Sequence, residues 1–292
     1  MRPKKALIGV KGSRTAGAPM RPRPGRALLL AALPIIIAHS TCAMAADPPT
    51  RQAVAELAPT GKLRAVINTG NPILAARDAA SGELKGVSVD LSRELAQRLS
   101  VPLEMVGVET AAKSVAAIKA GVCDVAFVAI DPARAVDMDY TAPYVLIEGV
   151  YLVPRTSSIM SNAEVDREGV RVVVGAGSAY DLYLSRELTK AQLVRAPTSQ
   201  AVVDQMLAQQ LDVSAGVKQL LEADAKRVEG VRLLDGHFMV INQAMATPRG
   251  RPEGVRYLAA FVEEMKASGF VVAALRRHSV DGAVVAPPSG SP

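Results

Sequence analysis

The sequence predicts an α/β fold with parallel-type sheets and helices on both faces of the sheets. Short apolar runs alternate along the chain with segments of helical periodicity. Residues 125–130 are apolar without interruption, which is typical of a parallel strand covered on both faces. Residues 90–99 place Leu91, Leu95 and Leu99 at four-residue spacing, which predicts a helix. Such sheets bind ligands at the carboxyl ends of their strands, so we look for a site there.

The first 45 residues predict a cleaved signal peptide. A basic segment precedes the apolar stretch 27–38, and the small residues Ala43-Met-Ala45 follow it. The basic segment is long if translation begins at Met1, whereas Met20 makes an ordinary start. A retained membrane anchor is the alternative, but the stretch is short for a span and Pro34 interrupts it.

Composition argues against a nucleic-acid partner and a metal cofactor. The net charge is +6, but eight of the 34 basic residues and none of the 28 acidic ones lie in residues 1–45, which leaves a net charge of −2. After the leader only Cys123 remains, so no intramolecular disulfide is possible, and His237 and His278 are isolated. No later segment is apolar enough to span a membrane, so we expect the mature protein to be soluble. We also expect an exported, periplasmic monomer without cofactors.

The first half of the mature chain alternates strands and helices. Residues 63–68 and 103–108 are predicted strands on either side of the helix at 90–99. Thr110 is placed to cap a helix over residues 111–120, which Gly121 ends.

The second half repeats the alternation. A strand at 170–174 leads through a glycine-rich turn into a helix at 179–188, and Thr198 or Ser199 caps the next helix. In that helix Met206 suits core packing rather than metal ligation. The remaining predictions are strands at 213–217 and 238–246, a helix that Pro252 opens and Gly269 ends, and a disordered tail at 285–292.

The segment after the buried strand at 125–130 is the first candidate for a ligand site. Asp131-Pro132 is a strand-ending and helix-starting pair, which places Arg134 in the first helical turn. Helix N–H groups and a guanidinium there favour a ligand carboxylate. The alternative is a surface arginine that forms a salt bridge with Asp131 or Asp137.

Five motifs give the chain a family resemblance. It resembles the family 3 solute-binding proteins of bacterial ABC importers over about residues 57–280. The motifs, in the family's order, are Gly61-Lys-Leu-Arg64, Leu84-Lys-Gly-Val-Ser-Val-Asp-Leu91, Ala120-Gly-Val-Cys-Asp124, Asp139-Tyr-Thr-Ala-Pro-Tyr144 and Val172-Val-Val-Gly-Ala-Gly-Ser178.

The resemblance implies a two-lobe periplasmic-binding-protein-like fold of type II. Lobe 1 would comprise residues 46–148 and 246–284, lobe 2 would comprise residues 149–245, and two hinge crossings would join them. A small carboxylate-bearing solute, an amino acid or a related organic acid, would bind between the lobes and pass to an ABC permease in the inner membrane.

The resemblance also implies the ligand-facing residues. Arg134 matches the arginine that holds the α-carboxylate, and Gly177-Ser178-Ala179 matches the second-lobe loop that completes the carboxylate site. A simple cap is the alternative role for Ser178. Ala129 stands where the family often has a hydroxyl.

The chain departs from the family where an aromatic side chain usually stacks on the ligand. Asn71-Pro-Ile-Leu74 occupies the place of an aromatic segment. Phe127 and Tyr180 are the candidate replacements, and core packing is the alternative role for each.

A second departure concerns the acid that pairs with the ligand's α-ammonium in the family. Gly216 or Val217 stands near that position, followed by Lys218. Either Asp131, Glu148 or Asp181 replaces the acid, or the ligand has no α-ammonium; we favour an organic acid. Lys218 would suit a second carboxylate, and a solvated helix start is its alternative.

Two other functions share this fold by resemblance. One is a periplasmic enzyme similar to cyclohexadienyl dehydratase, for which Glu148 is the acid nearest the hinge. The other is a scavenger that delivers ligand to a membrane sensor. We expect a binding protein and not an enzyme, because no histidine lies in a cleft motif.

Overall fold

The computed structural model describes residues 48–290. The predicted signal peptide with its alternative start at Met20, and the last two residues of the predicted tail, lie outside the described residues. Within residues 48–290, no helix has the length and apolar character needed to cross a membrane.

The strands form a mixed sheet that a continuous path of hydrogen bonds connects. Its order is β4-β1-β5-β11-β6-β9-β7-β8, with β10 and β12 paired to β6. The β2–β3 hairpin lies apart from it. The strands are β1 (Leu63–Asn68), β2 (Ala76–Arg77), β3 (Leu84–Lys85), β4 (Leu103–Val108), β5 (Val125–Ala129), β6 (Met138–Pro154), β7 (Arg171–Gly175), β8 (Gln192–Ala196), β9 (Val213–Val217), β10 (Val231–Leu233), β11 (Met239–Pro248) and β12 (Val284–Val285).

The sheet is parallel at its two ends and antiparallel in the middle. Strand β1 pairs in parallel with β4 and β5, and β7 pairs in parallel with β8 and β9. The long strands β6 and β11 pair with each other in antiparallel fashion and connect the two ends. The predicted parallel sheets are therefore present at both ends, joined by two long antiparallel strands.

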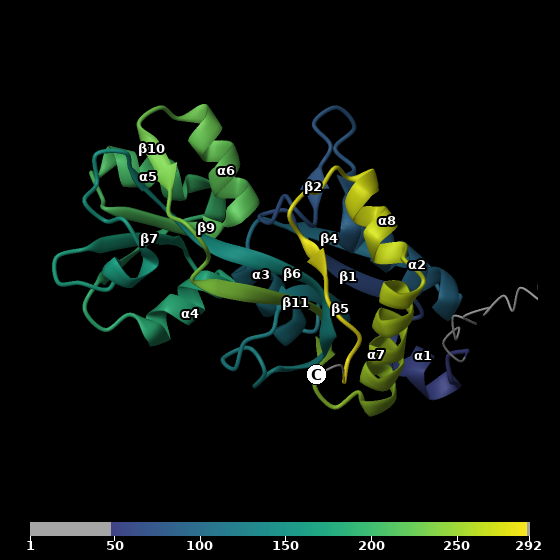
Figure 1. Ribbon diagram of the computed structural model, residues 1–292. Coiled ribbons are helices and arrows are strands. Elements are labelled where there is room, and N and C mark those ends of the chain that lie inside the picture. Colours follow the sequence, from purple (N-terminus) through teal and green to yellow (C-terminus); the bar gives the residue numbers. More distant parts are fainter. Residues whose placement is uncertain (1–47, 291–292) are drawn as a thin grey trace, which may run out of the picture. The chain divides into compact units, whose positions relative to one another are not determined.

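Helices cover both parallel parts of the sheet. They are α1 (Arg51–Leu57), α2 (Val87–Leu99), α3 (Ala111–Lys119), α4 (Ala179–Glu187), α5 (Val202–Ala208), α6 (Lys218–Arg227), α7 (Pro252–Ala267) and α8 (Phe270–Arg277), with short 3-10 turns at Asn162–Glu164 and Ser199–Ala201. We call β4, β1 and β5 with α1, α2, α3, α7 and α8 the first group, and β7, β8, β9 and β10 with α4, α5 and α6 the second group (Figure 1).

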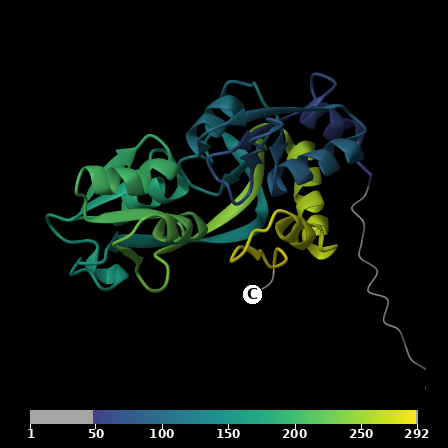
Figure 2. The same cartoon turned by 90° about the horizontal axis from the view of Figure 1, so that it is seen from above.

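Strands β6 and β11 run from the first group into the second, as the view from above shows (Figure 2). These strands form two crossings between the groups, as the resemblance implies, and the predicted lobe boundaries at residues 148–149 and 245–246 stay a prediction. Each group has buried apolar residues on its helices and strands, for example Leu91, Leu95 and Phe261 in the first group and Val202 and Met206 in the second.

Local sequence signals explain most element boundaries. Strands β1, β4 and β9 have the predicted bounds, and the Thr110 side chain caps α3 by accepting a hydrogen bond from the N–H of Lys113 at 3.2 Å. Pro252 begins α7 as predicted. The predicted side-chain cap at Thr198 or Ser199 does not form, because a 3-10 turn precedes α5.

The prediction of a helix that starts at Asp131-Pro132 is wrong. Residues 131–137 form hydrogen-bonded turns, and β6 begins at Met138. The Asp131 carboxylate accepts a hydrogen bond from the N–H of Ala133 at 2.8 Å, which stabilises a turn, and too few residues remain for a helix before the next strand. Arg134 therefore lies in a turn, where no helix N-terminus is available to a ligand.

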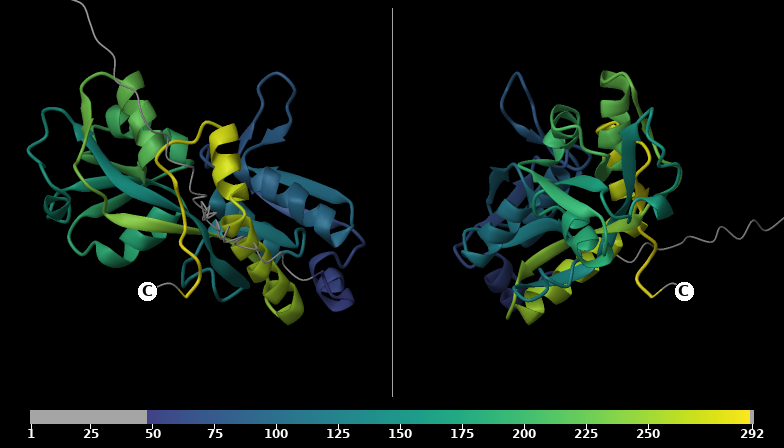
Figure 3. Two further views of the ribbon diagram at one scale, coloured as in Figure 1. Left: turned by 45° about the vertical axis from the view of Figure 1, so that its right-hand side comes forward. Right: turned by 90° about the vertical axis from the view of Figure 1, so that its left-hand side faces the viewer.

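The described part of the predicted tail packs against the sheet. Strand β12 pairs with β6, and the N–H of Ala286 donates to the carbonyl of Tyr144 at 3.1 Å (Figure 3). The Lys266 ammonium donates to the carbonyl of Pro287 at 2.9 Å. This packing differs from the disorder that composition predicts. Backbone hydrogen bonds to a long strand order this segment, although its amino-acid composition does not predict secondary structure.

Candidate functional site

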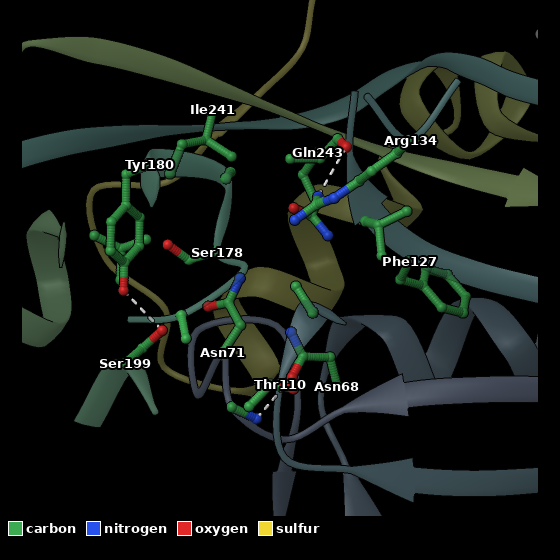
Figure 4. A pocket seen from close by; sticks show the side chains of 17 residues that line it. Asn68, Asn71, Thr110, Phe127, Arg134, Ser178, Tyr180, Ser199, Ile241 and Gln243 are labelled. Carbon is green, nitrogen blue, oxygen red and sulfur yellow. Dashed lines mark hydrogen bonds between the residues drawn. The ribbon is translucent and has the colours of Figure 1, made fainter. Parts of the chain in front are cut away.

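A cavity of about 50 Å³ lies where the first and second groups meet β11. Strand ends and helix starts supply its walls, as expected for α/β sheets. The lining residues are Asn68, Gly70, Asn71, Thr110, Ala111, Phe127, Val128, Ala129, Arg134, Ala176, Ser178, Ala179, Tyr180, Ser199, Val217, Ile241 and Gln243. Figure 4 shows Arg134 entering from one side and Tyr180, Ser178 and Ser199 from the other.

Arg134 provides the positive charge of the cavity. Its side chain is 4% exposed, and its guanidinium donates to the carbonyls of Ala129 at 3.1 Å and Gly177 at 2.9 Å. Burial lowers the pKa of this guanidinium, while Tyr140 and Asp131 act in the opposite direction. Two carbonyl oxygens do not neutralise a cation, so Arg134 keeps its charge available to an anion.

The alternative of a salt bridge for Arg134 does not hold within residues 48–290. Asp131 pairs with Arg186 at 2.9 Å, and Asp137 pairs with Lys119 at 2.8 Å. Both carboxylates named as partners are therefore occupied by other cations, and no described carboxylate lies within ion-pair distance of Arg134.

The start of α4 faces the cavity opposite Arg134. Ser178 caps the helix, and its hydroxyl oxygen accepts a hydrogen bond from the N–H of Asp181 at 3.0 Å. The first-turn N–H groups of Ala179 and Tyr180 have no acceptor within the helix and can bind an anion. The cap and the ligand-facing role of Ser178 are compatible.

Gly177 forms the tight turn that precedes this helix start. It has a φ of 66°, and an added Cβ would lie 2.7 Å from the Cβ of Ala112. Its N–H donates to the Asp181 carboxylate at 2.8 Å, and its carbonyl accepts from Arg134. Gly177 therefore positions Arg134 through its backbone and does not itself line the cavity.

Two aromatic residues border the cavity in place of a stacking platform. Tyr180 is 2% exposed and its hydroxyl donates to Ser199 Oγ at 2.7 Å. Burial raises the pKa of Tyr180. The Phe127 ring packs edge-on against Tyr144, with centroids 6.2 Å apart. Both side chains combine core packing with a small contribution to the cavity wall.

All the predicted site residues except Gly177 line the cavity, but their roles in ligand binding stay predictions. Sequence reasoning missed the lining side chains of Asn68, Thr110, Ser199, Val217, Ile241 and Gln243. Thr110 was predicted only as a helix cap, although a cap at a strand end is also a signal for a site. Ile241 and Gln243 lie on β11, far along the chain from the other residues, and no local pattern marks them.

The acids proposed as replacements for a missing carboxylate are all engaged elsewhere. Glu148 pairs with Lys218 at 2.6 Å, and the Asp181 carboxylate pairs with Arg195 at 3.0 Å. The Lys218 ammonium holds the pKa of Glu148 below its ordinary value. With Asp131 paired to Arg186, none of the three acids lines the cavity.

Lys218 does not reach the cavity either. It is the first residue of α6, and its side chain is partly exposed where it pairs with Glu148. The suggestion that it holds a second carboxylate of the ligand therefore has no support from its position. Within the described part of the chain, no group of three His, Cys, Asp or Glu side chains is arranged to hold a metal ion.

The fold and the cavity together define a class of protein, the two-lobed binding proteins whose ligand lies between parallel sheets joined by long crossing strands. Residues 63–279 match the model of the bacterial extracellular solute-binding proteins, family 3, and the chain belongs to this family. The predicted family and fold class are confirmed. A search of curated proteins finds no match.

Solved structures with this fold include several amino-acid-binding proteins. A mutant of ArgBP from T. maritima is 19% identical with a TM-score of 0.67, over 78% of this chain and 100% of that chain. A binding component of an ABC transporter from Wolinella succinogenes, solved with lysine, is 21% identical with a TM-score of 0.66, over 76% of this chain and 97% of that chain.

An ancestral amino acid-binding protein, a precursor of cyclohexadienyl dehydratase, is 21% identical with a TM-score of 0.64, over 77% of this chain and 98% of that chain. At these identities the similarity establishes the type II periplasmic binding protein fold and leaves the ligand of this chain undetermined.

Proposed function

We propose that the protein is the substrate-binding component of an ABC importer and captures a small carboxylate-bearing solute between its two lobes. The observation that carries this proposal is the buried guanidinium of Arg134, which has no ion-pair partner within residues 48–290 and faces the helix start at Ser178 across the cavity. A buried cation without a counter-ion is costly unless a ligand supplies the negative charge.

The geometry explains how such a ligand would favour closure. Arg134 belongs to the turn after β5 in the first group, and Ser178 belongs to the second group. A carboxylate that contacts both residues binds the closed arrangement more tightly than an open one, so binding shifts the population toward closure. Export through the predicted signal peptide and delivery by a monomer to an inner-membrane permease complete the proposal, together with a periplasmic location.

An enzymatic role receives less support. A dehydratase needs a general acid or base in its cavity. The described lining residues include no Asp, Glu, His or Lys, and burial raises the pKa of Tyr180, the one phenol among them. Glu148, the acid considered for such a role, is paired with Lys218. We therefore propose binding without turnover.

A thermal-shift panel tests the proposal. Small carboxylates and amino acids are compared on the wild type, on Arg134→Gln and on the control Arg256→Gln, which removes a cation from the exposed surface of α7. A ligand at 1,000 times its Kd should stabilise the wild type and the control by about 4 kcal/mol, and Arg134→Gln far less. An equal shift in Arg134→Gln would show that the carboxylate assignment is wrong.

A further inference from the structure

We propose that the ligand is a small 2-hydroxy monocarboxylate that carries no ammonium group. This inference rests on the proposed function and narrows its class of solute. It separates this chain from solved structures of the same fold that hold amino acids, such as the one with lysine.

The charge of the cavity is the first argument. Arg134 contributes one positive charge, and the described lining residues contribute no negative charge. A monocarboxylate makes the occupied cavity neutral. An α-amino acid would bring an additional ammonium into a cavity that already holds a guanidinium, and a buried cation without a counter-ion is strongly disfavoured. A dicarboxylate would leave one negative charge without a partner.

The surrounding acids offer no substitute for that missing counter-ion. Asp131, Glu148 and Asp181 each have a basic partner at 3.0 Å or less, namely Arg186, Lys218 and Arg195. Recruiting any of them to a ligand ammonium would break an existing ion pair and leave a cation behind.

The hydroxyl groups of the cavity are the second argument. Ser178, Thr110 and Ser199 each already accept a hydrogen bond, from the N–H of Asp181 at 3.0 Å, the N–H of Lys113 at 3.2 Å and the hydroxyl of Tyr180 at 2.7 Å. Ser178 also shares a hydrogen bond with the Tyr180 hydroxyl, so Thr110 and Ser199 are the hydroxyls that keep a proton to donate. Two hydroxyl donors and a guanidinium suit the oxygen atoms of a carboxylate and a hydroxyl better than the three N–H bonds of an ammonium.

Asn71 is the third argument, and it indicates what the second polar group is. Its Oδ1 atom is buried and has no hydrogen-bond partner within residues 48–290, and its side chain lines the cavity. A buried acceptor without a partner destabilises the protein, and a neutral donor on the ligand removes that cost. A ligand hydroxyl supplies that donor without adding charge.

The size of the cavity limits the ligand. A volume of 50 Å³ holds on the order of three to five water-sized groups, by comparison with the space that one water molecule needs. The smallest hydroxy acids, with two or three carbons, are nearest to this size.

Matched ligand pairs test the inference by titration calorimetry at neutral pH. The pairs are glycolate with glycine, L-lactate with L-alanine, and L-2-hydroxybutyrate with L-2-aminobutyrate, which differ in one polar group. We expect the hydroxy acid of the tightest pair to bind about 100-fold more tightly than its amino acid. A preference of at least tenfold supports the inference.

A smaller preference, or a preference for the amino acid, overturns the inference and leaves carboxylate capture intact. Absence of binding in all three pairs, and to the wider carboxylate panel, overturns the proposed function as well. The two failures are therefore distinguishable.

A reciprocal variant uses Val217, which lines the cavity at the end of β9 and is 7% exposed. Val217→Asp adds a carboxylate, and Val217→Asn has nearly the same shape without the charge. We expect Val217→Asp to gain at least tenfold in affinity for L-alanine and to lose as much for L-lactate relative to Val217→Asn. Equal preferences in the two variants would count against the charge argument.

Discussion

Replacing Arg134 with methionine separates a ligand-holding arginine from a structural one. Arg134→Met removes a buried cation whose hydrogen-bond partners within residues 48–290 are two backbone carbonyls, at 3.1 and 2.9 Å. Losing these two hydrogen bonds destabilises the protein, while removing an unpaired buried charge stabilises it, and each effect amounts to a few kcal/mol. Because they oppose each other, the ligand-free variant should be within about 1 kcal/mol of the wild type.

Arg64→Met is the matched control. Arg64 forms two hydrogen bonds of 2.8 Å with the fully buried carboxylate of Asp124. Its removal should cost about 2–3 kcal/mol, because Arg251 remains 3.0 Å from Asp124 as a second partner.

Urea unfolding with and without ligand measures both effects. The slope of the transition should be unchanged in both variants, so the midpoints report stability. With saturating ligand the wild type and Arg64→Met should each gain stability, and Arg134→Met should gain little. The reasoning is refuted if ligand-free Arg134→Met loses 3 kcal/mol or more, because Arg134 would then be a structural residue.

Three further predictions concern neighbouring groups. Arg186→Gln breaks the 2.9 Å ion pair with buried Asp131, and urea unfolding should show a loss of about 1–2 kcal/mol, reduced because Arg186 is 43% exposed; no loss would mean that the pair is solvated. Tyr180→Phe removes the hydrogen-bond donor to Ser199, and calorimetry should show ligand binding weakened roughly fivefold. Unchanged affinity would show that these two hydroxyl groups do not contribute to ligand binding. Burial raises the pKa of Cys123 from 9.0 to about 11, so the folded state binds this proton more tightly, and its contribution to stability is lost as the pH rises from 9 to 11. Iodoacetamide at pH 8 should label the thiol only after unfolding, and rapid labelling of the folded protein would contradict its burial.

The sequence could predict elements whose signal is local. Strands β1, β4 and β9 are short apolar runs with clear boundaries, and Thr110 and Ser178 are caps that the structure confirms. The turn at Asp131 was mistaken for a helix start, because Asp-Pro suits both and the nearby start of β6 decides between them.

The site could be predicted only in part, for a related reason. Arg134 and Ser178 follow strands directly, so the position of strand ends marks them. Gln243 and Ile241 come from the middle of β11, whose pairing with β5 brings Gln243 opposite Ala129. The partners of Glu148 and Asp131 depend likewise on contacts between distant segments, which a single sequence does not reveal.

A double-mutant cycle between Arg134 and the carboxylate of the ligand tests the central claim most directly. Calorimetry compares a bound carboxylate such as L-lactate with its neutral amide, on the wild type and on Arg134→Gln. We predict a coupling energy of about 2–4 kcal/mol, because the guanidinium is buried and has no counter-ion within residues 48–290. A coupling energy below about 0.5 kcal/mol would contradict the assignment of Arg134 as the residue that holds the carboxylate.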